Sequence, residues 1–541
     1  MVCQEFLVEE HKKGCHVLSI YSVSFCQGWP MIATIHSSAV LGIDAVPVAV
    51  EVDISFGLPV FNMVGLAEAA VRESKERVRA AIQNSGYTFP MDRVVVNLAP
   101  ADMKKQGTAL DLPVALGILT ASGLLSPQAT AKWLLAGELS LDGRLKPVRA
   151  ALPFALAAKQ AGFAGIILPG DNGQEAALVS GVKVMALSSL SQVVSFLTGN
   201  LDTEPVSASP DAPRPAPVGR GLPDFSQVRG QAHVKRALEI SAAGFHHLLM
   251  SGPPGSGKSM MAKRLPGILP LPSLDEAMEI ARIYSIGAEP GKVLETFGVR
   301  PFRSPHHSIS DAGLVGGGPR PLPGEISMAH NGVLFLDELP EFRRNVLEVL
   351  RQPLEEGTIT IARAGAKASF PCRFMLVAAM NPCACGNLGS PSRDCTCTLA
   401  RIRQYRSKIS GPLMDRMDLQ VEVPQVPYDD LAAAEDAESS AVIRDRVAAA
   451  RQIQGARFKD VNIFSNAAMG PDQIKAFCHL DKQTITRLKQ LMARFRFSAR
   501  AYTSLLKVAR TIADLSGQKQ ILEYHVLEAA QYKALERDKD A

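Results

Sequence analysis

Residues 252–259 read Gly252-Pro253-Pro254-Gly255-Ser256-Gly257-Lys258-Ser259, and this stretch decides the fold of the central part of the chain. It follows a short apolar run, His247 to Ser251, and precedes helix-forming residues. In a strand–loop–helix context, the pattern G-x-x-x-x-G-K-S is typical of a loop that binds nucleotide phosphates. Its glycines let backbone N–H groups surround the phosphates, and the helix start adds positive potential. We expect Lys258 to contact the β- and γ-phosphates and Ser259 to ligate Mg²⁺.

Two further apolar runs end in polar residues that suit the same chemistry. Val333 to Leu336 is followed by Asp337 and Glu338. Asp337 would hold Mg²⁺, directly or through water, and Glu338 would activate the attacking water as a general base. The run from Phe374 ends at Asn381, which could orient that water, although an Asn at a strand end is more often a turn residue. Together with the phosphate loop, these residues predict hydrolysis of a nucleoside triphosphate.

Length and composition limit the class of protein. The chain has 541 residues, 47% apolar and 21% charged, which predicts a soluble protein of several domains. No apolar run reaches the roughly 18 residues that a membrane span needs, so we expect no membrane contact. The net charge of +5 does not indicate nucleic acid by itself. The odd number of cysteines, 9, and the lack of a signal-peptide pattern predict a cytoplasmic protein.

Changes in composition divide the chain into five parts. The first fits no periodic pattern, so we expect a disordered extension or a mis-called start. The second alternates strand-like and helical runs and predicts an α+β or α/β domain. The third is rich in proline and predicts a linker. A second α/β domain and a helical region follow. The parts are residues 1–30, 31–198, 199–223, 224–428 and 429–541.

Four cysteines lie close together and suggest a metal site. They form a C-x-C pair, nine intervening residues and a second C-x-C pair, at Cys383, Cys385, Cys395 and Cys397. Thiolates at this density suit a tetrahedral, structural Zn²⁺. The alternative is a loop of free thiols. Cys372 and Cys478 stand apart, and we expect them to be ordinary buried cysteines.

Two segments are locally basic. Residues 359–367 predict a β-hairpin with Gly365 in the turn, which would carry Arg363 and Lys367. Between Lys482 and Ala513 there are eight basic residues and no acidic one. Either segment could contact a polyanion. The alternative for the hairpin is an exposed basic turn without a partner. For residues 482–513, a solvated helix face or contacts between subunits would explain part of the charge.

The order of these motifs resembles that of an AAA+ ATPase. After the phosphate loop, the Asp-Glu strand and the strand-end Asn comes Gly-Pro-Leu-Met-Asp-Arg-Met-Asp (411–418), and then the helical region. Within that class, the chain resembles the magnesium-chelatase-like group and its ComM (YifB) family of bacterial DNA-transformation helicases. Further motifs carry this resemblance over about residues 31–535. They are Arg303-Ser304-Pro305-His306-His307, Gly316-Gly317-Gly318, Gly324 to Gly332 and Ser498-Ala499-Arg500-Ala501-Tyr502.

The resemblance implies roles for residues that the sequence alone leaves open. The fold would be an AAA+ ATPase core with a helical lid. Arg416 would be an arginine finger that reaches the γ-phosphate of a neighbouring subunit, so the protein would form a homo-hexameric ring. Arg500 would be a second sensor arginine, acting in cis or in trans. The hairpin would face the central channel, where Arg363 and Lys367 would grip DNA phosphates. Residues 301–318, with His306 and His307, would be inserted near the pore.

The first domain resembles the ribosomal S5-type α+β domain of Lon proteases and of RadA-type recombination proteins. The resemblance is carried by Gly137 to Val148 and by Leu110 to Ala115. At the positions of the catalytic Ser and Lys of Lon, this chain has Val114 and Leu152. Peptidase chemistry is therefore not expected, because nucleophile and base are both missing. A ring scaffold or a DNA-binding platform is expected instead.

The function that the resemblance implies is a hexameric, ATP-hydrolysing DNA motor. Its cofactors would be ATP and Mg²⁺, with a structural Zn²⁺. It would act as a helicase or in branch migration on single-stranded and branched DNA during homologous recombination and natural transformation, with recombination proteins as candidate partners. One alternative is a chelatase-type ATPase that inserts a metal ion, which the extra first domain and the cysteine cluster disfavour. Another is an ATP-dependent chaperone that remodels proteins.

Overall fold

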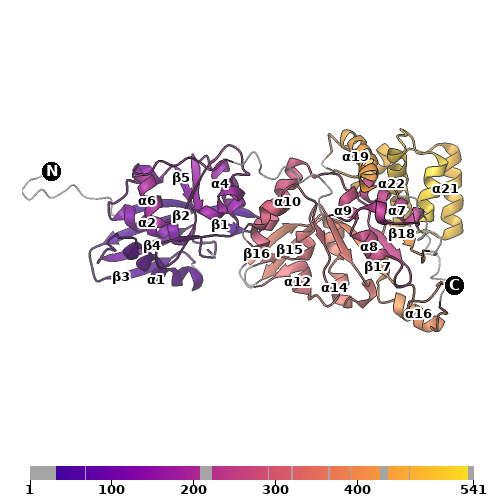
Figure 1. The fold of residues 1–541 in the computed structure, drawn as a ribbon, viewed down its shortest axis with the longest axis horizontal. Helices are drawn as coiled ribbons and strands as arrows, with labels where there is room; N and C mark the ends of the chain where they lie inside the picture. The colour runs from indigo at the N-terminus through magenta and orange to yellow at the C-terminus, as the bar shows by residue number, and fades with distance from the viewer. Residues whose placement is uncertain are drawn as a thin grey trace, which may run out of the picture.

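The computed structural model describes ten stretches of the chain: residues 32–66, 69–105, 107–207, 222–289, 291–318, 321–363, 366–390, 393–426, 437–461 and 463–533. The expected N-terminal extension, residues 208–221 of the expected linker and residues 429–436 lie outside them. The first domain, the central domain and the helical region follow one another along the long axis of the molecule, from indigo through magenta to yellow (Figure 1). None of the described helices is long and apolar enough to cross a membrane.

The first domain is built on a mixed seven-stranded sheet. Strands β1 and β2 form a long antiparallel ladder, because the turn between them is only two residues, and β4 continues the antiparallel pairing. The other neighbours pair in parallel. The strand order is β3 (Val60–Val64), β4 (Arg93–Ala99), β2 (Asp44–Ser55), β1 (Ile32–Leu41), β5 (Trp133–Leu135), β8 (Gly165–Pro169) and β9 (Lys183–Leu187).

Apolar helices cover this sheet. The helix α2 is buried along its whole length, and it lies so close to the sheet that a Cβ on Gly117 would meet Val52 Cγ2 at 2.5 Å. Val114 and Leu152 are both fully buried, so these positions serve packing and offer no nucleophile or base. The elements outside the sheet are α1 (Ala69–Asn84), α2 (Asp111–Ala121), α3 (Pro127–Thr130), the short hairpin β6 (Glu138–Leu139) and β7 (Leu145–Lys146), α4 (Ala151–Gln160), α5 (Gly173–Ala176) and α6 (Leu190–Leu197).

The central domain has a five-stranded, fully parallel sheet. Every residue of its three inner strands is buried, as expected for a sheet with apolar layers on both faces. Leu248 and Met250 point into one apolar cluster, and Leu249 between them points into another. The order is β11 (Phe302–Arg303), β14 (Val333–Leu336), β17 (Met375–Met380), β10 (Leu248–Ser251) and β18 (Leu419–Glu422). Because β17 lies between β14 and β10, the carboxyl ends of these three strands are neighbours.

Helices and two hairpins surround this sheet. The expected hairpin is present as β15 (Thr358–Arg363) and β16 (Ala366–Pro371), with its turn at 364–365 outside the described residues. A second, smaller pair is β12 (Gly316–Gly317) and β13 (Leu322–Pro323). The helices are α7 (Ala232–Gly244), α8 (Lys258–Ala262), α9 (Leu265–Ile268), α10 (Leu274–Gly287), α11 (Lys292–Thr296), α12 (Asp311–Val315), α13 (Glu325–Met328), α14 (Arg344–Glu348), α15 (Arg351–Glu356), α16 (Leu399–Arg406) and α17 (Gly411–Met414).

The C-terminal region is helical, as the sequence predicts. It comprises α19 (Ser440–Arg457), α20 (Pro471–Phe477), α21 (Lys482–Phe495), α22 (Ala499–Leu515) and α23 (Glu523–Gln531). Its apolar side chains share one core cluster with the central sheet. The basic patch predicted for residues 482–513 does not include every basic residue of this segment. Arg510 is only 2% exposed and pairs with Asp514, and the Lys507 ammonium donates to the Ala467 carbonyl.

The first and central domains pack directly on each other through α10. Ile283 and Tyr284 of α10 share an apolar cluster with Leu152 and Phe154 of α4. The Ala150 N–H also donates to the carbonyl of Ser285, at 2.8 Å. Along the expected linker, the Val206 N–H donates to the Val184 carbonyl at 2.8 Å, so the described start of this segment lies against the first domain.

Candidate nucleotide site

The phosphate loop connects β10 to α8 and depends on glycine at three points. Gly255 has a φ of +76° and Gly257 a φ of +89°, a left-handed conformation that other residues adopt only with strain. A Cβ on Gly252 would lie 2.1 Å from the carbonyl oxygen of Val423, which follows β18. The loop is therefore held against the neighbouring strand, with its backbone available to a ligand.

Lys258 begins α8, and its ammonium is bound by the loop itself. Its Nζ donates to the carbonyl oxygens of Gly252 at 2.6 Å and of Pro253 at 2.9 Å, and it lies 3.4 Å from Oδ1 of Asn381. Burial lowers the pKa of Lys258, and the carboxylates after β14 oppose that effect. Phosphate oxygens could replace the carbonyl oxygens as acceptors with a gain in charge pairing.

Ser259 and Asp337 meet beside this lysine. The hydroxyl of Ser259 donates to Oδ2 of Asp337 at 2.5 Å, and the N–H of Glu338 donates to the other carboxylate oxygen at 3.0 Å. A hydroxyl and a carboxylate oxygen at this separation are hard ligands of the kind that Mg²⁺ takes in phosphate sites, so the donor set fits the expected ion. A bound Mg²⁺ would neutralise charge on the β- and γ-phosphates.

Glu338 lies at the open side of the site in an unusual conformation. Its φ of +52° is in the left-handed region, which costs energy for a residue with a side chain and is common at functional sites. The side chain is 56% exposed, and Oε2 lies 3.5 Å from Nδ1 of His307. The carboxylate can therefore reach a water molecule on the solvent side of the phosphate loop.

A hollow of about 610 Å³ adjoins the loop. Gln231, with a φ of +52°, lines it and donates its amide to the carbonyls of Ser256 at 3.0 Å and Pro424 at 2.8 Å. Most of the other lining residues come from α7 and α19, among them Lys235, Arg236, Glu239, Ile443 and Arg446. The hollow lies between the central domain and the helical region, and it is large enough for a nucleoside.

Comparisons with known proteins agree with this architecture. Family models match three segments: Magnesium chelatase, subunit ChlI (residues 224–431), Subunit ChlI of Mg-chelatase (50–172) and Magnesium chelatase, subunit ChlI C-terminal (437–533). YifB of Escherichia coli is 44% identical over 513 residues, which is 94% of this chain and 98% of that protein. Competence protein ComM of Haemophilus influenzae is 43% identical over 511 residues, also 94% and 98%. The chain belongs to the ComM/YifB family.

A more distant relative matches only part of the chain. The magnesium-chelatase 38 kDa subunit of Cereibacter sphaeroides is 26% identical over 174 residues, which is 29% of this chain and 52% of that subunit. The magnesium-chelatase family model places the AAA+-type core of this ComM/YifB-family protein at residues 224–431, and the chain is similar to ComM and YifB over nearly their whole length.

The two expected arginines of the ComM/YifB-family protein lie together, apart from the phosphate loop. Arg416 follows α17, and Arg500 is in the first turn of α22. Both donate to the carboxylate of Glu355 on α15. In the described part of the chain, neither donates to a residue of its own phosphate loop.

The basic hairpin lies on the side of the central domain that adjoins the first domain (Figure 1). The side chain of Lys367 is exposed on β16, and Arg363 ends β15, directly across the ladder from Ala366. The side chain of Arg363 lies outside the described residues. The grip of this hairpin on DNA stays a prediction.

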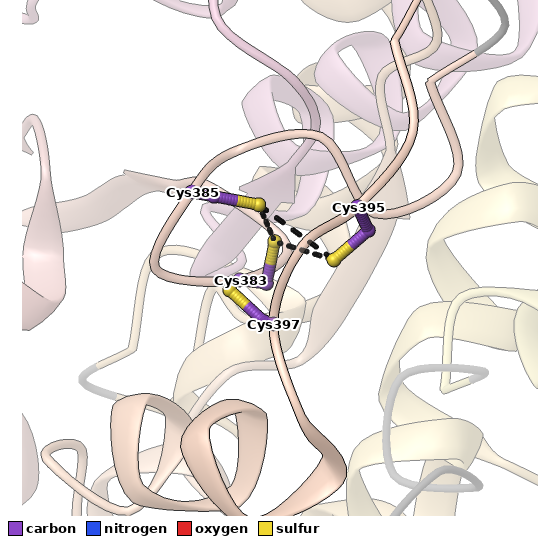
Figure 2. A group of neighbouring side chains, drawn as sticks. All are labelled: Cys383, Cys385, Cys395 and Cys397. Carbon is purple, nitrogen blue, oxygen red and sulfur yellow. Dashed lines mark hydrogen bonds between the residues drawn. The ribbon is translucent and has the colours of Figure 1, made fainter.

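The four clustered cysteines converge on one point (Figure 2). The Sγ–Sγ distances are 3.4 Å from Cys383 to Cys385, and 3.6 Å from Cys395 to each of these. All four sulfurs, including that of Cys397, lie within 4.8 Å of one another. Sulfurs of a tetrahedral Zn²⁺ site are about 3.8 Å apart, so the four thiols could hold a metal ion. Cys372 and Cys478 are buried elsewhere, as expected.

The cysteine loop also touches the phosphate loop. A Cβ on Gly386, between the two cysteine pairs, would lie 2.8 Å from Cδ of Pro254. Backbone N–H groups of Asn387 and Thr396 and the neighbouring thiol of Cys383 lower the pKa of Cys385 to about 5, which favours the thiolate at that position. A backbone N–H lowers the pKa of Cys395, but burial and the neighbouring thiols outweigh it and raise that pKa to about 11, and burial raises the pKa of Cys397.

Two residues and one contact at these sites were not found by sequence reasoning. Gln231, Glu355 and the contact of His307 with Glu338 each depend on segments that are distant in the chain. A lone Gln or Glu in helical sequence carries no local signal. The left-handed conformation of Gln231 could not be predicted from the sequence either, because residues in that conformation are usually glycines and a glutamine does not indicate it.

Proposed function

We propose that this ComM/YifB-family protein is an ATPase that assembles as a homo-hexamer and moves DNA through the ring. The observation that carries the ATPase is the convergence of five side chains at one edge of the parallel sheet. Lys258 would bind the phosphates, Ser259 and Asp337 would hold Mg²⁺, Glu338 would activate water, and Asn381 would orient it.

The position of the arginines supports a site shared between subunits. Arg416 and Arg500 contact Glu355 and not their own phosphate loop. A guanidinium that must reach the γ-phosphate therefore serves a neighbouring chain, which requires a closed ring. We propose the same role in trans for both arginines.

DNA is the substrate that we favour. The exposed Lys367 on a two-stranded hairpin is suited to backbone phosphates in a channel. One relative bears the name competence protein, which fits a task in transformation. We propose helicase or branch-migration activity on single-stranded and branched DNA during recombination and natural transformation, in the cytoplasm and with recombination proteins as candidate partners.

This proposal is tested by measuring phosphate release with and without single-stranded and forked DNA. We expect DNA to raise the ATPase rate of the wild-type protein severalfold. A rate that ignores DNA and responds to a porphyrin with chelatase partners, or to unfolded protein, would favour metal insertion or protein remodelling instead.

Lys367→Ala is expected to lower the affinity for DNA on the order of tenfold and to leave the DNA-free ATPase rate unchanged, because each subunit loses one phosphate contact. The salt dependence of binding should also become shallower. Fluorescence anisotropy with labelled DNA measures both. Lys183→Ala removes an exposed lysine from the first domain and is the matched control. If both variants changed the affinity for DNA equally, the hairpin would not be a specific DNA contact.

We also propose that the four cysteines hold a structural Zn²⁺. The four convergent sulfurs support this proposal. The close approach of Gly386 to Pro254 indicates what the ion would stabilise, because it joins the cysteine loop to the phosphate loop. A fixed cysteine loop would hold the outer side of the phosphate loop in place.

Cys383→Ser is expected to lower the zinc content from about one ion per chain and to lower the melting temperature. Elemental analysis of the purified protein and a thermal melt measure the two effects. Cys478→Ser, in the helical region, should keep the zinc. A wild-type protein purified without zinc, and insensitive to added zinc in the melt, would leave the cluster as free thiols.

A further inference from the structure

One carboxylate joins the two arginines. Oε1 of Glu355 accepts from Nη2 of Arg416 and, at 3.2 Å, from Nη1 of Arg500. The Arg416 side chain is 6% exposed, whereas that of Glu355 is 49% exposed. Solvent therefore reaches this group of three side chains at Glu355 and Arg500, whereas Arg416 is buried.

The segments that carry the arginines are fixed to each other independently of Glu355. The hydroxyl of Ser504, one helical turn after Arg500, donates to Asp418 at 2.6 Å. The other oxygen of Asp418, two residues after Arg416, lies 3.0 Å from Nδ1 of the buried His246. The two arginines are thus presented as one unit, and only their acceptor can change.

Glu355 does not satisfy these guanidinium groups fully. Arg416 donates through Nη1 to the Pro412 carbonyl at 2.5 Å, but its buried Nε has no hydrogen-bond partner. Two cations also share a single carboxylate oxygen. The terminal phosphate of a nucleotide offers three oxygens and more negative charge, so it is a better acceptor for the pair.

Glu355 also lies at the base of the basic hairpin. It is the next-to-last residue of α15, and Gly357, with a φ of +64°, leads into β15. The Gly357 carbonyl accepts from the N–H of Cys372 at 2.8 Å, which closes the base of the hairpin. Leu354 packs against the same apolar cluster as Ile359 of β15, so α15 and the first strand of the hairpin share one core.

The geometry points to Glu355 as a positioning residue that couples the nucleotide of one subunit to the DNA hairpin of the next. Without a neighbour's ATP, Glu355 holds Arg416 and Arg500. When the γ-phosphate takes the arginines, Glu355 is released, and α15 and the hairpin can shift. The inference rests on the proposed function, because it needs the ring and its shared site.

Glu355→Gln and the matched control Glu356→Gln test the inference. Glu356 is the adjacent carboxylate, and its partner is Gln352, at 2.8 Å. The first measurement needs neither ring nor DNA. Phenylglyoxal modification of Arg416 and Arg500, followed by peptide mass spectrometry without nucleotide, should be severalfold faster in Glu355→Gln than in wild type or in Glu356→Gln. Equal rates in all three proteins would overturn the pairing.

The second measurement is the ratio of ATPase rates with and without forked DNA. In Glu355→Gln the rate without DNA should rise and the ratio should fall toward one, while the affinity for ATP stays unchanged. Glu355→Asp, which keeps the charge, should restore part of the ratio. A wild-type ratio in Glu355→Gln, or a parallel loss of both rates with a lower melting temperature, would overturn the coupling role. A wild-type protein that ignores DNA would instead contradict the proposed function, and the modification rates would still report on the arginine pairing.

Discussion

Glu338→Gln is expected to lower the ATPase rate by about 10²- to 10⁴-fold. Gln has nearly the shape of Glu but cannot accept a proton from water. The change leaves Lys258 and its loop intact, and Ser259 and Asp337 keep their contact, so ATP should still bind. Steady-state phosphate release and equilibrium binding of labelled ATP measure the two properties separately, and sedimentation reports on whether the ring is assembled.

The control for this prediction is Glu341→Gln, three residues further along the chain. Glu341 pairs with Lys408 at 3.3 Å, and its side chain is half exposed, like that of Glu338. We expect little change in rate from its loss, because exposed ion pairs contribute little. Normal ATP hydrolysis by Glu338→Gln would mean that the catalytic base has been assigned to the wrong residue.

Arg416→Ala is expected to lower the ATPase rate at least as much as Glu338→Gln. An arginine finger contributes about 10³- to 10⁵-fold to phosphoryl transfer, because its charge stabilises the transition state. Binding of ATP should persist, since Arg416 makes no hydrogen bond to its own phosphate loop in the described part of the chain. The loss should therefore appear in kcat, with little change in the affinity for ATP, measured on the same preparation.

Two further variants distinguish this role from loss of folding. Arg351→Ala removes a neighbouring arginine on α15 whose ion-pair partner is Glu348, not Glu355, and it should retain most activity. Arg416→Lys keeps the charge but loses the planar fork, and it should remain folded and nearly inactive. A melting temperature that falls with activity in both Arg416 variants would point to a structural role for this residue.

The sequence was sufficient for the features that are local. The phosphate loop has a motif of fixed spacing, and the apolar runs of β14 and β17 are short enough to favour buried strands over helices. Parallel strands present their carboxyl ends at one edge of a sheet, so polar residues at the ends of such runs come together. The structure places Asn381 within 3.4 Å of Lys258, in keeping with that logic.

The sequence was not sufficient where a residue's role depends on a distant partner. Glu355 looks like any acid of a solvated helix until Arg416 and Arg500 are folded onto it. The prediction of a basic surface over residues 482–513 was wrong at Arg510 for the same reason. Arg510 is buried against Asp514, an acid just beyond that segment. Charge along the chain therefore predicts a surface only for residues that lack internal partners.

The central claim, that each ATP is cleaved by residues of two subunits, is tested most directly by combining two inactive variants. If the proposed hexamer forms, rings of co-expressed Glu338→Gln and Arg416→Ala chains would pair an intact base with an intact finger at about one quarter of their interfaces. We expect each variant alone to be inactive and the mixed rings, isolated through two different tags, to hydrolyse ATP and to respond to DNA. Mixed rings as inactive as either parent would contradict a shared site.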